Sequence, residues 1–364
     1  MPAILRQPGV VALCLLAGGW AMAGVATRPA PETRVVYRND FAKAAGPEWS
    51  AQDVTPTPKG GNRILGPFAK AKVSLSLAKL PAHRYLRVSF DLVLIGSWDG
   101  NHAQWGPDTW RLDVAGGPTL LATTFCYDDG EARQAFPDQQ AGADHPPETG
   151  AATTDTTGFR FRNDPVDAVY KLSFVFPHTA DAVRFDFAAT GNIVNLQDES
   201  WGLDDVKVEA LAGPAPVGAA ALRRLWEQLG GGDPVAAHRA KWALIAAGAP
   251  GRRFLREQLD RDPAAADSKK VARLIAQLDH DDWRTREAAT EALIRMGPPV
   301  RAAVGAAAGP GASLEVRTRS ERILKAMTPS ASATPREMRR RRAAHALAVL
   351  SWLPAKGATA PAER

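Results

Sequence analysis

The feature that most constrains the fold of this chain is a change of hydrophobic period near its middle. Up to residue 211 apolar residues recur at every second position, whereas beyond residue 222 they recur with the period of helices. A Pro/Gly/Ala-rich segment, residues 212–221, separates the two patterns. The sequence therefore predicts a multidomain protein, all-β in its first part and all-α in its second, with 212–221 as the linker.

The period-two segments are short and follow one another without an intervening helical pattern. Each such strand has one apolar face to bury and needs a second sheet to cover it. We therefore predict an antiparallel β-sandwich over residues 34–211. Residues 128–158 show no period and are predicted to form a long mobile loop. The predicted strands begin at Val35, Val73, Tyr85, Thr109, Thr119, Tyr170, Val183 and Val206.

The helical part contains internal repeats. The segment LWEQLGGGDPVAAHRAKWALIAAGAP from Leu225 aligns with LIAQLDHDDWRTREAATEALIRMGPP from Leu274, and a third copy, LEVRTRSERILKAM, starts at Leu314. Asp233 and Asp282 stand where helix N-caps belong. Because one helical hairpin cannot bury its apolar stripe alone, we predict a short α-solenoid over residues 222–353 and a disordered tail over 354–364. Three tryptophans fall on the predicted core stripes: Trp226, Trp242 and Trp283.

The first 23 residues have the pattern of a secretory signal peptide. Arg6 provides a basic start, residues 10–23 are mostly apolar, and small residues precede Gly24. A membrane anchor is the alternative, but it needs about 20 apolar residues. We expect cleavage, no membrane span afterwards, and a secreted, periplasmic or cell-envelope location. Cleavage leaves Cys126 without a disulfide partner, and we predict that it is a buried, small apolar residue.

Charge divides along the same boundary as the hydrophobic period. Residues 24–212 carry 18 Lys and Arg against 24 Asp and Glu, whereas residues 213–364 carry 26 against 15. The segment REMRRRRAAHALAVLSWL, residues 336–353, predicts a terminal helix with a solvated basic face. Attraction between the acidic and basic parts of the chain is an alternative role for these arginines. A signal peptide makes nucleic acid an unexpected partner.

Two resemblances to known families follow from these segments. LDHDDWRTREAATEAL and SLEVRTRSERILKAM make residues 222–353 similar to HEAT repeats of the phycobilisome-lyase-like kind common in planctomycete proteins. That resemblance implies a scaffold that binds a protein partner. VSFDLVLIGSWDGN, GPDTWRLDV, YKLSFVFPH and DESWGLDDVKV make residues 34–211 similar to concanavalin/laminin-G-like or carbohydrate-binding-module-like jelly rolls. This second resemblance implies a lectin-like module for a glycan or protein ligand.

The same resemblance implies a structural calcium ion. In such modules an aspartate of the closing strand often holds Ca²⁺ against the first strand, and here Asp204 or Asp205 with Asp40 would do so. Leu203 is out of phase with Val206, which predicts a β-bulge at Asp204 and Asp205. The alternative is that these carboxylates are solvated and keep a sheet edge soluble.

The segment SWDGNHAQWGPDTW, residues 97–110, is the second candidate site. Exposed tryptophan rings stack on sugars, and Asp or Asn side chains bond to hydroxyl groups. Trp105 is the best exposed candidate, whereas Trp98 and Trp110 have the alternative of plugging the ends of the sandwich. The predicted ligand-binding residues are Trp98, Asp99, Asn101, Trp105 and Asp108.

Catalysis is not expected. Asp198 and Glu199 are adjacent and should point apart, unlike the paired carboxylates of glycosidases, and there is no nucleophile-elbow, phosphate-loop or dinucleotide motif. We predict an exported, non-enzymatic scaffold that binds a glycan or cell-envelope protein through the sandwich and a protein partner through the helices. The alternatives are a purely structural envelope protein and a glycan-active hydrolase that depends on Glu199.

Overall fold

The computed structural model describes residues 33–352, except 103, 128–131, 140–142, 194, 262–263, 297–299, 310 and 327–332. The predicted signal segment and the predicted tail lie outside the described residues.

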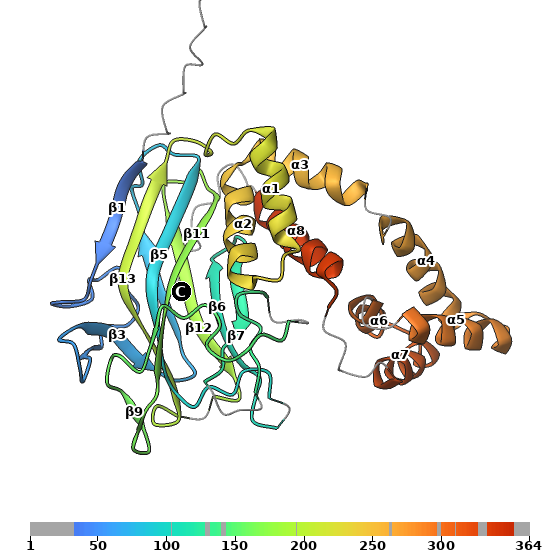
Figure 1. Cartoon of the computed structure of the whole chain (residues 1–364), viewed down its shortest axis with the longest axis horizontal. Coiled ribbons are helices and arrows are strands. Elements are labelled where there is room, and N and C mark those ends of the chain that lie inside the picture. The colour runs from blue at the N-terminus through green and yellow to red at the C-terminus, as the bar shows by residue number, and fades with distance from the viewer. Residues whose placement is uncertain are drawn as a thin grey trace, which may run out of the picture. The chain divides into compact units, whose positions relative to one another are not determined.

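The first part of the chain is a two-layered β-sandwich (Figure 1). One sheet has the order β2-β3-β13-β5-β11-β8, with β1 beside β13, and the other has the order β4-β12-β6-β7. The main strands are Thr33–Asn39 (β1), Val54–Pro56 (β2), Arg63–Phe68 (β3), Lys72–Leu77 (β4), Tyr85–Gly96 (β5), Asp108–Val114 (β6), Thr119–Thr124 (β7), Asp167–Pro177 (β11), Val183–Gly191 (β12) and Glu199–Leu211 (β13), and three two-residue strands are Thr153–Thr154 (β8), Arg160–Phe161 (β9) and Asp164–Pro165 (β10).

Every predicted period-two segment is a strand, and apolar residues of most of these strands fill the space between the two sheets. Phe90 of β5 and Phe187 of β12 meet across the layers at 5.3 Å between ring centroids. Trp110 of β6 and Trp201 of β13 meet in the same way at 6.0 Å. The prediction of a β-sandwich is therefore confirmed.

The predicted bulge is also present. The pairing of β13 with β5 shifts register between Asp204 and Lys207, and Asp205 has a φ of 48°. An extra residue in one strand lets the apolar positions on both sides of it face the core. This explains why Leu203 and Val206, although out of phase, are both fully buried.

The second part of the chain is helical. Asp233 caps α2 by accepting hydrogen bonds from the backbone N–H groups of Val235 and Ala236, at 2.9 and 3.0 Å. Asp282 caps α5 by accepting from Thr285 N at 2.9 Å, so both predicted N-caps are confirmed. The helices are Ala219–Leu229 (α1), Pro234–Ala246 (α2), Ala249–Asp260 (α3), Ala264–Ala276 (α4), Gln277–Asp279 (η1, a 3₁₀ turn), Trp283–Met296 (α5), Arg301–Ala307 (α6), Leu314–Ala326 (α7) and Pro335–Ser351 (α8).

The helices divide between two hydrophobic cores. Residues of α4 to α7, among them Leu278, Leu293 and Ile323, form a core of their own. Residues of α1, α2, α3 and α8 instead belong to the core of the sandwich. One continuous solenoid over residues 222–353 stays a prediction. Trp283, predicted to lie in a helical core, is 60% exposed because it is the first residue of α5 and lies at the helix end.

Helices α2 and α8 cover the edge of the sandwich at β11 and β7. Trp242 of α2 packs edge-on against Phe174 of β11, with centroids 4.9 Å apart. From α8, His345 bonds to the carbonyl of Thr119 at 3.2 Å, and Trp352 follows with a bond to the carbonyl of Gly116 at 3.1 Å. The two parts of the chain therefore share one core although their sequence patterns differ.

The predicted mobile loop is wrong for the described residues of 128–158. Gln134 is fully buried, and Phe136 is 3% exposed and stacks on Phe125 with centroids 4.8 Å apart. The segment shows no hydrophobic period because its backbone is irregular. It nevertheless packs against α2, where the ring of Phe136 lies 5.6 Å from the ring of His238.

An ion pair is buried where this segment meets α8. Arg342 donates from Nε and Nη2 to the two carboxylate oxygens of Asp138, each at 2.7 Å, and from Nη1 to Leu229 O at 2.6 Å. His145 Nε2 lies 3.0 Å from Asp138 Oδ2. Burial opposes ionisation of Asp138, but the bonds from Arg342 and His145 hold its pKa well below the usual range. One arginine of the basic segment thus binds the acidic part of the chain instead of facing water.

Candidate functional site

The loop between β5 and β6 carries the predicted ligand-binding residues, and Asn101 anchors it to the neighbouring segment. Asn101 N donates to Arg133 O at 2.7 Å, and its side-chain Nδ2 donates to Ala143 O at 3.0 Å. Its Oδ1 accepts from Thr124 Oγ1 at 2.5 Å. The side-chain N–H and carbonyl groups of Asn101 are both used in hydrogen bonds within the protein, so Asn101 stabilises the loop. This geometry does not support its predicted role as a ligand contact.

Trp98 is not placed to contact a ligand. It is 2% exposed, and its indole N–H donates to Ser200 O at 3.1 Å. Trp110 is fully buried. The prediction of Trp98 as a ligand-binding residue is therefore corrected, because both rings fill the end of the core, which was the alternative interpretation.

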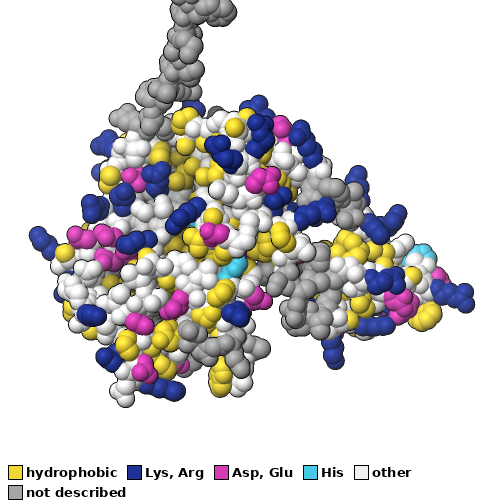
Figure 2. All heavy atoms as spheres, in the orientation of Figure 1, with side chains coloured by type: hydrophobic (Ala, Val, Ile, Leu, Met, Phe, Trp, Pro, Cys, Tyr) yellow, Lys and Arg dark blue, Asp and Glu magenta, His cyan; other side chains and the backbone are white. Residues whose placement is uncertain are grey.

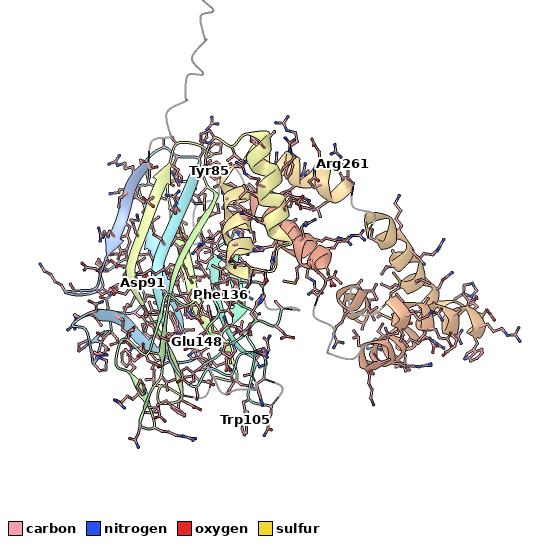
Figure 3. The ribbon with its side chains drawn as sticks, in the orientation of Figure 1. Tyr85, Asp91, Trp105, Phe136, Glu148 and Arg261 are labelled. Atoms are coloured by element: carbon pink, nitrogen blue, oxygen red, sulfur yellow. The ribbon has the colours of Figure 1, made fainter. Side chains whose placement is uncertain are left out.

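Trp105 is the exposed aromatic residue of this loop, at 58%. Its backbone N–H and that of Gln104 both donate to His102 Nδ1, at 3.1 and 3.2 Å. Gly106 O accepts from Asn192 Nδ2 at 2.6 Å, which ties the loop to the end of β12. Figure 3 shows Trp105 at the end of the sandwich opposite Tyr85. The backbone is held while the ring projects into solvent.

Beneath this loop the structure brings three carboxylates together. Asp99, Asp108 and Glu199 each offer an oxygen, and these oxygens lie within 4.8 Å of one another. Asp108 Oδ2 accepts from the backbone N–H of Asp99 at 2.5 Å. Asp108 and Glu199 are 0% and 2% exposed, whereas Asp99 is only partly buried. We call these residues the carboxylate cluster. Its donor set fits a metal ion that prefers oxygen ligands.

The pleat of two strands explains why the cluster forms. Asp108 lies two residues before Trp110 on β6, and Glu199 lies two residues before Trp201 on β13. Alternate residues of a strand face the same side. The two tryptophans meet between the sheets, so the two acids face each other one step nearer the end of the sandwich.

The surroundings disfavour ionisation of both buried acids. Burial raises the pKa of Asp108 to about 6. Burial, followed by the neighbouring charges of Asp108, Asp198 and Asp99, raises the pKa of Glu199 to about 9. In the part of the chain that the structure describes, no Lys, Arg or His side chain pairs with either acid.

Sequence reasoning placed Asp99 and Asp108 in a ligand site but did not join Glu199 to them. The available signal was a repeated pattern, an acid two residues before a buried tryptophan, in Asp108-Thr109-Trp110 and Glu199-Ser200-Trp201. The pattern predicts which face each acid occupies. It does not say which strands are opposite each other, so it could not predict the pairing.

The predicted calcium residues Asp40, Asp204 and Asp205 do not form such a group among the described residues. Burial raises the pKa of Asp204 to about 6, and the charges of Asp205, Asp91 and Asp40 add to that effect. Asp205 lies 3.8 Å from Arg38, and both side chains are exposed. Calcium at these residues stays a prediction.

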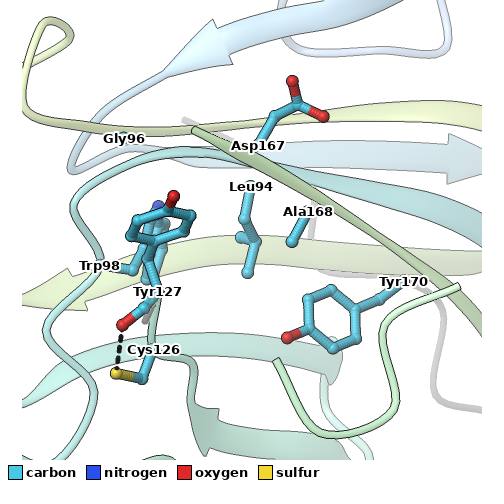
Figure 4. A pocket seen from close by; sticks show the side chains of 8 residues that line it. All are labelled: Leu94, Gly96, Trp98, Cys126, Tyr127, Asp167, Ala168 and Tyr170. Carbon is cyan, nitrogen blue, oxygen red and sulfur yellow. Dashed lines mark hydrogen bonds between the residues drawn. The ribbon is translucent and has the colours of Figure 1, made fainter. Parts of the chain in front are cut away.

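A small cavity lies near the ends of β5 and β11, and no residue of the carboxylate cluster lines it (Figure 4). Its volume of about 10 Å³ is room for about one water molecule. Cys126 on its wall is 3% exposed, as predicted for a buried small residue. A sugar ring cannot enter this cavity. The cavity is lined by Leu94, Gly96, Trp98, Cys126, Tyr127, Asp167, Ala168 and Tyr170.

Substituting Gly96 should disrupt the support of this site. Gly96 has a φ of 90°, and a Cβ there would lie 1.8 Å from Asp198 O. We expect Gly96→Ala to lower the free energy of unfolding by about 2–4 kcal/mol, from backbone strain and the clash together. Gly60→Ala is the control: its φ is 95°, but nothing lies within 4 Å of its Cβ. Equal losses for the two variants in denaturant unfolding would contradict the prediction.

Comparison with known proteins gives a limited likeness. No protein-family model and no curated protein matches the chain. Among solved structures, dimeric latent PorU from Porphyromonas gingivalis is 11% identical with a TM-score of 0.30, over 50% of this chain and 13% of PorU. A carbohydrate-binding module of Cellvibrio mixtus lichenase 5A, in complex with cellotriose, is 14% identical with a TM-score of 0.24, over 48% of this chain and 97% of the module. The C-terminal CBM6 module of LamC from Zobellia galactanivorans is 12% identical with a TM-score of 0.22, over 49% and 98%. At these values the likeness assigns neither a site nor a ligand to this chain.

Proposed function

We propose that the chain is an exported, non-catalytic protein whose sandwich binds a glycan on the surface around Trp105. The observation that carries this proposal is a 58%-exposed tryptophan on a backbone held by hydrogen bonds at His102 and Asn192. Because the backbone is held before binding, only the side-chain torsions of Trp105 have to be ordered when a flat apolar face stacks on the ring. Gln104, the preceding residue, is exposed, and its side-chain amide suits hydroxyl groups.

Hydrolysis is the second candidate, because two acids with raised pKa values are typical of catalytic sites. Asp108 and Glu199 are enclosed, at 0% and 2% exposure. A glycosidase needs room for a sugar between its two carboxyl groups. The burial of both acids therefore favours binding without turnover. Release of reducing sugar from a polysaccharide panel, abolished by Glu199→Gln, would favour the hydrolase instead.

For the helical part we propose a protein partner. Leu314 and Trp283, which begin α7 and α5, are 73% and 60% exposed. A contiguous exposed apolar patch marks a protein contact, and we propose these two side chains as members of such a patch. On the face seen in Figure 2, Lys and Arg side chains are dispersed among Asp and Glu side chains. That arrangement differs from the continuous basic stripe typical of nucleic-acid-binding proteins.

The cellular location is part of the proposal. A signal segment at residues 1–23 would direct the chain out of the cytoplasm, to the envelope or beyond. Within the described ranges, the search for an apolar helix of membrane-spanning length found none.

Replacing Trp105 tests glycan binding directly. We expect Trp105→Ala to weaken binding to a responsive polysaccharide at least about tenfold, because the stacking surface is lost. Trp283→Ala, which removes an equally exposed tryptophan from α5, should leave it unchanged. Glycan-array screening followed by calorimetry measures both. Binding that survives Trp105→Ala, or an absence of any glycan ligand, would favour the purely structural envelope protein.

A further inference from the structure

The carboxylate cluster places acidic side chains where the core of the sandwich would otherwise continue. Asp108 and Glu199 face each other from different sheets, next to the contact of Trp110 with Trp201. Both acids are buried, and no cationic side chain of the described residues pairs with them. A buried carboxylate is stable only when a proton, an opposite charge or a metal ion neutralises it.

Two oxygen atoms of this cluster accept no hydrogen bond from a described residue outside it. Asp108 Oδ1 and Glu199 Oε2 are inaccessible to solvent, and the two carboxyl groups lie close enough to hydrogen-bond to each other when one of them is protonated. An unsatisfied buried polar atom costs about 1–3 kcal/mol, more when it is charged. Two such atoms within one small cluster can be satisfied in two ways, by a proton that the two carboxyl groups share or by a cation that both of them bind.

We infer that Asp99, Asp108 and Glu199 bind one hard divalent cation, with Ca²⁺ as the best fit. The three side chains offer oxygen atoms only, which excludes the nitrogen and sulfur donors that zinc and copper prefer. Oxygens on opposite sides of a Ca²⁺ ion lie about 4.6–5.2 Å apart, so oxygens within 4.8 Å of one another fit inside one coordination sphere. Asp99, which is only partly buried, gives the ion its path from solvent.

The cation connects three segments. Asp99 lies at the start of the loop that carries Trp105, Asp108 begins β6, and Glu199 begins β13. A bound ion would hold this loop to both sheets at once. The inference does not rest on glycan binding, because the site would stabilise the fold whatever ligand Trp105 contacts.

Terbium luminescence tests the inference on the purified full chain. Tb³⁺ is a Ca²⁺ substitute, and Trp98 and Trp110, close to the cluster, would sensitise its emission. After treatment with chelator, we expect the wild type to bind one Tb³⁺ that Ca²⁺ displaces more readily than Mg²⁺. Asp108→Asn and Glu199→Gln preserve side-chain shape and should each weaken binding at least about tenfold. Asp40→Asn, Asp204→Asn and Asp205→Asn should bind as the wild type does.

Three results would overturn the inference. They are no displaceable Tb³⁺ in the wild type, unchanged binding in Asp108→Asn and Glu199→Gln, and loss of binding in Asp204→Asn or Asp205→Asn alone. If the cluster variants fail to fold, crystals of the wild type soaked with Tb³⁺ test the inference instead. An anomalous peak between the three carboxylates would support it, and a peak elsewhere or none would overturn it. Trp105→Ala should lose glycan and keep Tb³⁺, so the failure of one proposal is distinguishable from the failure of the other.

Discussion

Arg342→Met should lower the free energy of unfolding by about 3–5 kcal/mol, the cost of leaving a buried charge without its partner. Arg342 is 5% exposed and makes two bonds to Asp138 at 2.7 Å and one to Leu229 O at 2.6 Å. Methionine retains much of the side-chain length but none of these donors. Denaturant unfolding of the full chain, followed by tryptophan fluorescence, measures the loss.

Two further variants distinguish the effect of the unpaired Asp138 charge on stability from the effect of a changed side-chain shape on α8. Arg341→Met, one residue earlier on α8, removes an ion pair with Glu337 that is partly exposed, and should cost less than about 1 kcal/mol. Adding Asp138→Asn to Arg342→Met should restore part of the stability, because the orphaned carboxylate is then neutral. A loss below about 1 kcal/mol in Arg342→Met alone would mean that water reaches Asp138 and that the helices do not seal the sandwich edge.

The sequence predicted the elements well because their signals are local. Alternation along Tyr85–Gly96 and Val183–Gly191 shows strands with one buried face, and Asp233 and Asp282 mark helix starts by the chemistry of their side chains. The sharing of one core between the sandwich and α2 and α8 has no local signal. It depends on contacts such as Trp242 with Phe174, between residues distant in the chain. Residues 132–139 were predicted to be mobile because they have no hydrophobic period. They are packed through contacts with distant residues, which the local sequence does not show.

The candidate site was predicted in part for a related reason. The composition of residues 97–110 indicated a binding loop, and Trp105 is exposed as expected. Composition does not show which side of the loop each residue occupies, so Trp98 and Asn101 were counted as ligand contacts although both are engaged in the fold. Glu199 joins the site only because β13 lies opposite β6 across the core, a relation that one strand's pattern does not contain.

Acid should weaken the contact between the helices and the sandwich, through two histidines. Burial, with the nearby charge of Lys241 as the next cause, lowers the pKa of His238 and of His345 to about 3 each. The charge of Asp138 favours protonation of both, but has a smaller effect. His238 Nδ1 bonds to Pro137 O at 2.8 Å, and His345 Nε2 bonds to Thr119 O at 3.2 Å.

The sign of the pH effect follows from linkage. The unfolded chain protonates both histidines near pH 6.5, whereas the folded chain keeps them neutral until about pH 3, so the unfolded state binds about two more protons in between. These two groups alone make the free energy of unfolding fall by about 3 kcal/mol per pH unit as pH decreases through that window. The double variant His238→Asn and His345→Gln keeps a donor at each position without a titrating group, and should remove that slope between pH 6 and 4.5. The exposed His280→Asn should not alter it. An unchanged slope in the double variant would show that these histidines are protonated in the folded protein and that the interface tolerates their charge.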